Sequence, residues 1–233
     1  MSRHVVPTRK PKYLYGDFTV ILIGSKPNYR MKSYGPLSLL KIDGMRLIEK
    51  QNQIIRKIAP DAEIILVTGF ETDKILKKIP YGIRIIENCR YDETNECEDI
   101  RLALNATLHN KVVIINYNLI FSESVLKCIT NNQSYIIVDS DKQISLNEIG
   151  VTSIDSKPTI LSYSIESPKW CRITSFVNKE FNLLKTLCQN RENSRKLLVE
   201  ILNEILNQEN QFLTIQPPNS KVIFFGDSKE IKK

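Results

Sequence analysis

The sequence predicts an α/β protein with a mostly parallel central sheet and helices on both of its faces. Strand-like and helix-like segments alternate over the first 140 residues, which is typical of parallel sheets with right-handed crossovers. The expected strands are almost continuous runs of β-branched residues, as in strands that are covered on both faces. With 233 residues, 42% of them hydrophobic, the chain can bury a sizeable core.

The first half of the chain supplies five of the expected strands. They cover residues 18–23, 63–68, 83–87, 112–116 and 135–139. The helix-like segments between them cover residues 44–58, 71–78, 96–108 and 122–129. Asp43 and Ser122 stand where the first and last of these helices need an N-cap, and Gly24–Pro36 is expected to be a polar loop.

The second half changes character and predicts a C-terminal extension of strands and helices. Residues 150–154 and 159–165 flank Ser156-Lys157-Pro158 and predict a hairpin. Two amphipathic helices are expected next, and two short strands end the chain, at residues 176–188, 193–206, 212–215 and 222–225. The apolar stripe of the second helix indicates core packing or, alternatively, contact with a partner.

Composition excludes several classes of protein. The five cysteines are scattered without a CxxC pair, and the two histidines, His4 and His109, are far apart, so neither a disulfide framework nor a zinc site is expected. No apolar run approaches the ~20 residues of a membrane span, and the start of the chain lacks the apolar stretch of a signal peptide. We therefore expect a cytoplasmic protein that does not associate with membranes.

The loop after the first expected strand combines small residues with positive charge. Gly24 and Ser25 follow the strand directly, and Arg30 and Met31 come six residues later. A glycine lets backbone N–H groups approach a phosphate, and an arginine adds positive charge. The loop is similar to the phosphate-binding loop of the family named below, and this resemblance implies Gly24, Ser25 and Arg30 as candidate phosphate-binding residues, with an ordinary exposed arginine as the alternative for Arg30.

Polar residues also follow the third and fourth expected strands. Thr94 and Asn95 precede a helix, and residues 87–95 resemble a stretch near the base and acceptor pocket in the family named below. This resemblance implies that Thr94 and Asn95 are candidates for lining a nucleotide or acceptor pocket. The alternative is a turn, because both residue types hydrogen-bond the backbone well. The fourth strand ends in Tyr117-Asn118, and a tyrosine there either blocks a cleft, stacks on a base or packs under a loop.

These segments, in this order, resemble the nucleotidyltransferases of phosphorylated sugars and alcohols, a group with a Rossmann-like GT-A fold that includes the phosphocholine cytidylyltransferases. The resemblance spans about residues 18–233. It implies one domain, residues 17–233, with a nucleotide-binding half at 17–140 and an acceptor-side half at 141–233, behind a basic flexible arm at 1–16. It also implies an NTP as ligand and Mg²⁺ as the cofactor of an active member.

The chain departs from this family where the family performs its chemistry. Asn118 replaces a metal-binding Asp, and neutral oxygen holds Mg²⁺ more weakly than a carboxylate does. Leu37 stands where the family has a lysine for the phosphates, and Asp99 where it has a serine. Asp227 fits the second metal-binding carboxylate, with a helix N-cap as the alternative. The resemblance thus implies a degraded catalytic centre.

Three functional hypotheses follow. The first is a binding or assembly subunit without catalysis, with a protein partner or a second copy of the chain. The second is an active, divergent nucleotidyltransferase that moves NMP from CTP or UTP to a phosphorylated sugar or alcohol, with Asp139 or Asp141 replacing the lost carboxylate. The third is a glycosyltransferase-like or nucleic-acid-associated protein, for which the net charge of +7 and the basic termini are the argument.

Overall fold

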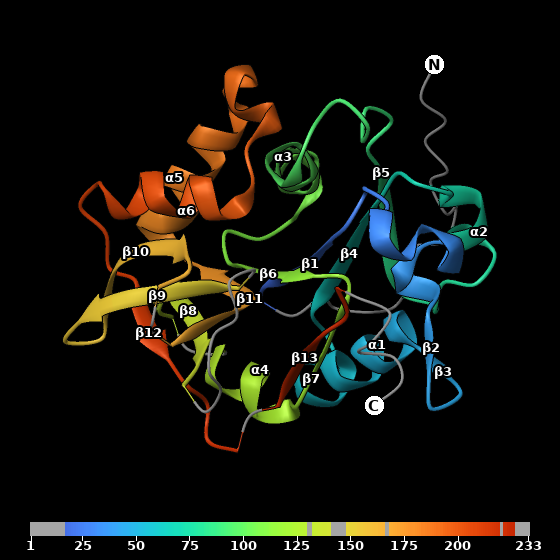
Figure 1. The fold of residues 1–233 in the computed structure, drawn as a ribbon, viewed down its shortest axis with the longest axis horizontal. Helices are drawn as coiled ribbons and strands as arrows, with labels where there is room; N and C mark the ends of the chain where they lie inside the picture. Colours follow the sequence, from blue (N-terminus) through green and yellow to red (C-terminus); the bar gives the residue numbers. More distant parts are fainter. Residues whose placement is uncertain (1–16, 130–131, 141–147, 166–167, 220, 227–233) are drawn as a thin grey trace.

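The computed structural model describes residues 17–129, 132–140, 148–165, 168–219 and 221–226. Its centre is a nine-stranded sheet. Four neighbouring strands of this sheet, in the order β5-β4-β1-β6, run parallel to one another. They are β5 (Ile83–Glu87), β4 (Glu63–Thr68), β1 (Thr19–Ile23) and β6 (Val112–Asn116). The expected α/β class with a mostly parallel central sheet is confirmed (Figure 1).

The second half of the chain continues the same sheet through one long strand. β11 (Lys169–Phe176) lies antiparallel to β6 on one side and to β8 and β9 on the other. The remaining strands on this side are β8 (Tyr135–Asp139), β9 (Ile149–Ile154), β10 (Lys157–Tyr163) and β12 (Leu213–Ile215). Because β11 is antiparallel to β6, its first residues lie at the edge where the parallel strands end.

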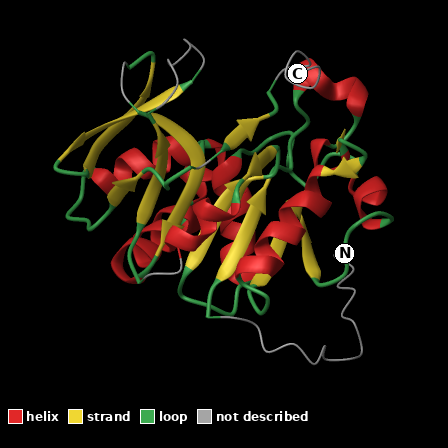
Figure 2. Cartoon of the chain, turned by 90° about the horizontal axis from the view of Figure 1, so that it is seen from below, coloured by secondary structure: helices red, strands yellow, loops and turns green. Residues whose placement is uncertain are grey.

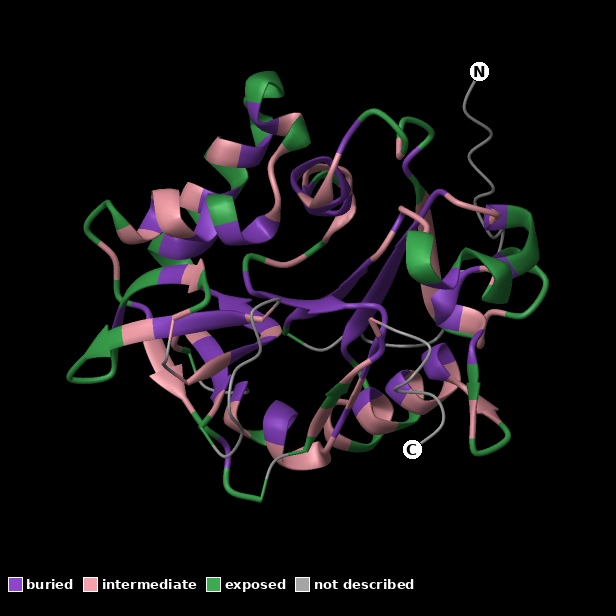
Figure 3. Ribbon diagram, viewed as in Figure 1, coloured by how far each residue is buried: buried purple, intermediate pink, exposed green. Residues whose placement is uncertain are grey.

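Helices cover both faces of the sheet (Figure 2). One apolar layer packs under α3 (Glu96–Ala106), α5 (Asn178–Gln189) and α6 (Leu198–Leu206), and the other under α1 (Leu47–Ile58) and α4 (Glu123–Ile129). Alternate residues of β1 face opposite layers, Ile21 and Ile23 one and Val20 and Leu22 the other, and all four are buried (Figure 3). A strand between two apolar layers has no polar face, which explains its continuous hydrophobic run.

Smaller elements complete the description. They are η1 (Tyr29–Tyr34), η2 (Leu37–Leu39), β2 (Lys41–Ile42), β3 (Met45–Arg46), α2 (Thr72–Leu76), β7 (Leu119–Phe121), η3 (Arg191–Arg195) and β13 (Val222–Phe224). β13 pairs antiparallel with β7, next to the tip of β6. None of the helices within the described ranges is long and apolar enough to cross a membrane.

Several sequence-based expectations about elements were wrong. Asp43 does not cap α1, because Asp43 and Gly44 both have positive φ angles, 51° and 81°, and form the turn of the β2–β3 hairpin. The loop at 24–36 contains the 3₁₀ helix η1. The helix expected from residue 193 starts at Leu198, after the separate 3₁₀ helix η3. β11 was not anticipated at all.

The expected core stripe of α6 is confirmed. Leu198, Ile201, Leu202 and Ile205 are fully buried against the sheet, with Leu197 and Leu206 partly buried beside them. The stripe is therefore occupied by the protein's own core. It offers no free apolar face for a partner.

Candidate functional site

The loop after β1 is covered by an aromatic ring. Tyr117, at the end of β6, lies so close to Gly24 that a Cβ on Gly24 would stand 1.5 Å from the Tyr117 ring. Only glycine fits under this ring. The Tyr117 hydroxyl donates to the carbonyl of Lys26 at 3.3 Å, and burial raises the pKa of the phenol. The sequence leaves three roles open for Tyr117. These contacts show the third, a ring packed against the loop.

A buried carboxylate holds the backbone of the same loop. The N–H of Ser25 donates to Asp99 Oδ2 at 3.1 Å, and Asn88 Nδ2 donates to Asp99 Oδ1 at 2.8 Å. Asp99 is only 2% exposed, in the first turn of α3. Burial raises its pKa to about 6; the hydrogen bonds from Ser25 and Asn88 lower it in part, and the charge of Glu96 raises it.

The loop is also pinned on its outer side. The carbonyl of Ser25 accepts from the N–H of Phe70 at 2.7 Å, and Asn28 Nδ2 donates to the carbonyl of Gly226 at 3.0 Å. Gly24 and Ser25 thus lie where the sequence placed them, at the ligand-binding edge of the sheet. The N–H of Ser25, the group suited to a phosphate, bonds a carboxylate of the chain itself.

Thr94 is part of a turn. Its hydroxyl donates to the carbonyl of Arg90 at 2.7 Å and accepts from Asn88 Nδ2 at 3.0 Å, and the residue is 1% exposed. Asn88 Oδ1 in turn accepts from the N–H of Arg90 at 3.0 Å. Both polar functions of Thr94 are used inside the protein, which favours the turn interpretation over a ligand-binding one.

Asn95 and Glu96 fasten this turn to the C-terminal part of the chain. Asn95 Nδ2 donates to the carbonyl of Arg195 at 2.7 Å, and its N–H donates to the carbonyl of Ser194 at 2.9 Å. Glu96 Oε2 accepts from the N–H of Leu198 at 2.7 Å and so caps α6. These contacts are a physical reason for Thr94-Asn95 to be present without any ligand.

Asn118 performs a task that an aspartate cannot. Its side-chain Nδ2 donates to the main-chain carbonyl of Phe225 at 2.9 Å. The main-chain carbonyl of Asn118 accepts from the N–H of Phe225 at 3.0 Å. An ionised carboxylate has no N–H to donate and would face the Phe225 oxygen. The amide is therefore matched to the chain segment around β13, which crosses the tip of β6.

The donors that the structure describes around Asn118 do not make a Mg²⁺ site. Asn118 Oδ1 and Asn116 Oδ1 are buried oxygens without a hydrogen-bond partner, but both are neutral. The nearby carboxylates are engaged: Asp99 by Ser25 and Asn88, and Glu96 by Leu198. No group of three His, Cys, Asp or Glu side chains suited to a metal occurs in the part of the chain that the structure describes.

Of the remaining candidates, Arg30 and Asp139 lie in the described part of the chain and do not join this constellation. Arg30 lies on η1 and is exposed, and its N–H donates to Asn28 Oδ1 at 3.1 Å. Asp227 lies outside the described residues, as do the basic arm 1–16 and Asp141. Asp139 ends β8 at the same edge of the sheet, but β11 lies between β8 and β6, so Asp139 is two strands, or about 10 Å, from the tip of β6.

Beside Asp139, sequence reasoning missed an arginine. Arg172 interrupts the pairing of β11 with a φ of 56°, a left-handed conformation that is uncommon for a non-glycine residue. Its guanidinium lies 4.7 Å from the ring centre of Phe224 and 5.9 Å from that of Trp170. Together with the Lys169–Glu148 ion pair it lines a small pocket between the end of β8 and the start of β11. Because β11 itself was not expected, no sequence signal pointed to Arg172.

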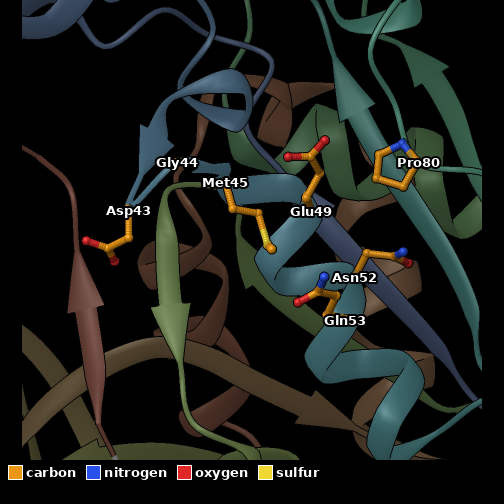
Figure 4. Close-up of a pocket in the computed structure, with 7 residues that line it drawn as sticks. All are labelled: Asp43, Gly44, Met45, Glu49, Asn52, Gln53 and Pro80. Carbon is orange, nitrogen blue, oxygen red and sulfur yellow. The ribbon is translucent and has the colours of Figure 1, made fainter.

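A larger hollow of about 630 Å³ lies elsewhere, between the β2–β3 hairpin, α1 and Pro80 (Figure 4). Two carboxylates at its rim are paired with the chain's own cations, Asp43 with Lys50 at 2.8 Å and Glu49 with Arg46 at 2.6 Å. None of the sequence-predicted site residues lines it.

The comparisons with solved structures identify the class of fold. The inositol-1-phosphate CTP transferase from T. maritima superimposes with a TM-score of 0.74 at 14% identity, over 92% of this chain and 91% of that one. The CTP:phosphocholine cytidylyltransferase from Streptococcus pneumoniae gives a TM-score of 0.75 at 11% identity, over 93% of this chain and 96% of that one. No family model and no curated protein matches the chain.

The chain therefore has the nucleotidyltransferase fold, and the resemblance inferred from its sequence is confirmed at the level of fold. A putative glucose-1-phosphate thymidylyltransferase from Bacillus anthracis has the same fold, with a TM-score of 0.71 at 10% identity, over 93% of this chain and 92% of that one. At these identities the likeness concerns the fold alone, and the reaction has to be argued from the site.

Proposed function

We propose that this protein is a non-catalytic binding or assembly subunit built on the nucleotidyltransferase fold. The observation that carries the proposal is the ring of Tyr117 packed directly on Gly24. A phosphate-binding loop needs open space above a small residue so that a ligand can approach the backbone. In this chain a side chain fills that space.

The hydrogen bonds of the loop support the same proposal. The N–H of Ser25 donates to Asp99, and the carbonyls of Ser25 and Lys26 accept from Phe70 and Tyr117. A nucleotide would have to replace these bonds with its own. Above pH 6, where Asp99 is mostly ionised, it would also meet a negative charge behind the loop.

A thermal-shift experiment tests the proposal. The purified protein is heated with CTP, UTP, ATP or GTP, each with and without Mg²⁺, and we expect no shift of the Tm with any of them. A ligand at 100 times its Kd adds ~2.7 kcal/mol, which corresponds to roughly 5–10 °C at this chain length. A Mg²⁺-dependent shift with one nucleotide would refute the proposal and identify the base.

A matched variant tests the observation itself. Tyr117→Gly removes the ring from above Gly24, whereas Tyr117→Phe keeps the ring and removes only its hydrogen bond to Lys26. If the ring excludes nucleotides, Tyr117→Phe stays as insensitive to NTPs as the wild type. A nucleotide-induced shift in Tyr117→Phe would mean that the ring is no obstacle.

The second candidate function is an active, divergent nucleotidyltransferase. The small pocket at Arg172 favours this function, because Arg172, Lys169 and Asp139 bring charges of both signs to the edge where the parallel strands end. The measurement is pyrophosphate release from each NTP with a panel of phosphorylated sugars and alcohols in the presence of Mg²⁺. Release that disappears in Asp139→Asn would establish this function and a role for Asp139 in it.

A further inference from the structure

One corner of the molecule carries two stretches of chain without a single acidic residue. Residues 18–42 contain Lys26, Arg30, Lys32 and Lys41 but no Asp or Glu. Residues 74–86 contain Lys74, Lys77, Lys78 and Arg84, again without an acid. The first stretch includes η1 and the second includes the end of α2, and the two elements lie at the same side of the molecule (Figure 1).

Two contacts join η1, in the first stretch, to Phe70 and Glu71, which lead into α2. Lys32 Nζ lies 5.8 Å from the ring centre of Phe70, just before α2. A Cβ on Gly35, after η1, would stand 3.2 Å from Glu71 Oε2. η1 therefore packs beside the start of α2, and their positive charges add to one field instead of lying on separate faces.

The same corner exposes aromatic rings. On η1, Tyr29 is 76% exposed and Tyr34 47%. They alternate with the cations along the chain, as Tyr29-Arg30 and Lys32 to Tyr34. We call these two tyrosines with Arg30, Lys32, Lys77 and Lys78 the basic corner. The chain's own acids neutralise it only in part: Glu71 pairs with Lys74 at 2.6 Å, and Asp73 is the other acid on α2.

We propose that the basic corner binds single-stranded nucleic acid. Cations that track a phosphate backbone, interleaved with aromatic faces on which bases stack, are the chemistry of single-strand recognition. An acidic peptide would pair with the cations alone, whereas the bases of a single strand would also stack on the tyrosines. The basic corner shares only Arg30 with the candidate nucleotide site, so this inference is independent of the proposed loss of catalysis.

The test is fluorescence anisotropy of the full-length protein with a labelled oligouridine of about 12 nucleotides, a length within the range that one such surface binds. Oligothymidine of equal length separates RNA from DNA. Binding should weaken with salt, with a log–log slope of about −0.7 for each phosphate contacted. A duplex of the same length should bind distinctly more weakly, because its bases cannot stack on the tyrosines.

Two double variants locate the surface. Lys77→Glu with Lys78→Glu should weaken binding at least tenfold and reduce the salt slope. Tyr29→Ala with Tyr34→Ala should weaken it about five- to one-hundred-fold for each stacking tyrosine with little change in salt slope. Circular dichroism and the Tm confirm that each variant is folded.

The matched control is Lys157→Glu with Lys185→Glu, which makes the same change of net charge at exposed lysines on β10 and α5. It should retain nearly all of the binding. The proposal is overturned by an absence of oligouridine binding, by an equal loss in the control variant, by equal affinity for the duplex, or by polyglutamate competing as well as unlabelled oligouridine. The last result would assign the basic corner to an acidic protein partner.

Discussion

Polar groups are used in opposite ways at the tip of the central sheet, where β1 and β6 end, and at the basic corner. At the tip, Ser25, Asp99 and Asn118 direct their hydrogen bonds inward, to other residues of the protein. At the basic corner, Tyr29, Lys77 and Lys78 are exposed to solvent. Polar groups are thus satisfied internally at one site and presented outward at the other.

This contrast separates two uses of one fold. Parallel sheets commonly bind ligands at the edge where their strands end. At this edge the chain has the ring of Tyr117 packed against Gly24 and the amide of Asn118 bonded to Phe225, and both contacts stabilise the structure. A loop that only needs to be stable tolerates such side chains, whereas a loop that receives a phosphate does not. We therefore look for binding on the outer surface, and expect substitutions at the tip to affect stability and those at the corner to affect binding.

Removal of the Tyr117 ring should have the largest effect on stability. Tyr117→Gly leaves a cavity above Gly24 and breaks the hydrogen bond to Lys26, and losses of a buried aromatic side chain amount to about 3–5 kcal/mol. Urea denaturation measures the difference. Tyr117→Phe, the control, should lose only about 0.5–1.5 kcal/mol. Equal stability of Tyr117→Gly and the wild type would show that the ring does not support the loop.

Asp99 should make stability depend on pH between about 4 and 6. Its pKa is raised from 3.8 to about 6 in the folded protein, so the folded state keeps its proton over a range in which the unfolded state releases it. The stability that this group contributes is fully present below pH 4 and is lost as the pH rises through 6, by about 3 kcal/mol at most.

Asp99→Asn isolates this contribution, because other carboxylates act in the opposite direction. Glu98, for example, has its pKa lowered by the hydrogen bond from Arg101, so its contribution is lost as the pH falls. The measurement is the free energy of unfolding at several pH values for both proteins. The difference between the wild type and the variant should change between pH 4 and 6 and be flat above. A constant difference would assign Asp99 an ordinary pKa.

Asn118→Asp should destabilise the protein by about 1–3 kcal/mol at neutral pH, because a carboxylate loses the bond to the Phe225 carbonyl and faces that oxygen. Asn118→Ala, which adds no charge, should cost less. Both are compared by urea denaturation with and without Mg²⁺. If Mg²⁺ restored the stability of Asn118→Asp, the tip of β6 would contain a metal site that this one substitution completes.

The residues of β4, β5, β6 and β8 agree with the expected strands at both ends. For β4 and β6 the reason is burial on both faces, which leaves a nearly unbroken apolar run. β5 is only partly buried, and its β-branched residues are the signal that marks it. β11 escaped notice because Lys169, Arg172 and Thr174 interrupt its apolar residues. Asp43-Gly44 was taken for a helix start although Asp-Gly is a strong hairpin signal.

The sequence predicted where the candidate residues lie in the fold, but not what they contact. Gly24, Ser25, Thr94, Asn95 and Asn118 all follow the C-terminal ends of parallel strands, as strand order and turn residues indicated. Their partners could not be predicted, because each hydrogen bond joins segments distant in sequence, such as Asn118 with Phe225 or Asn95 with Arg195. Whether a polar side chain faces a ligand or its own backbone depends on those tertiary contacts.

The smallest effect on stability is expected at the basic corner. Lys77→Glu with Lys78→Glu changes two exposed side chains and should alter the free energy of unfolding by no more than about 0.5 kcal/mol, as surface substitutions usually do. The two glutamates repel each other as the two lysines do, and they put negative charge at the C-terminal end of α2, so a slight loss is the expected sign at low salt. Urea denaturation at low and high salt measures it. A loss of several kcal/mol would mean that these lysines support α2, and the separation between a tip that stabilises and a corner that binds would no longer hold.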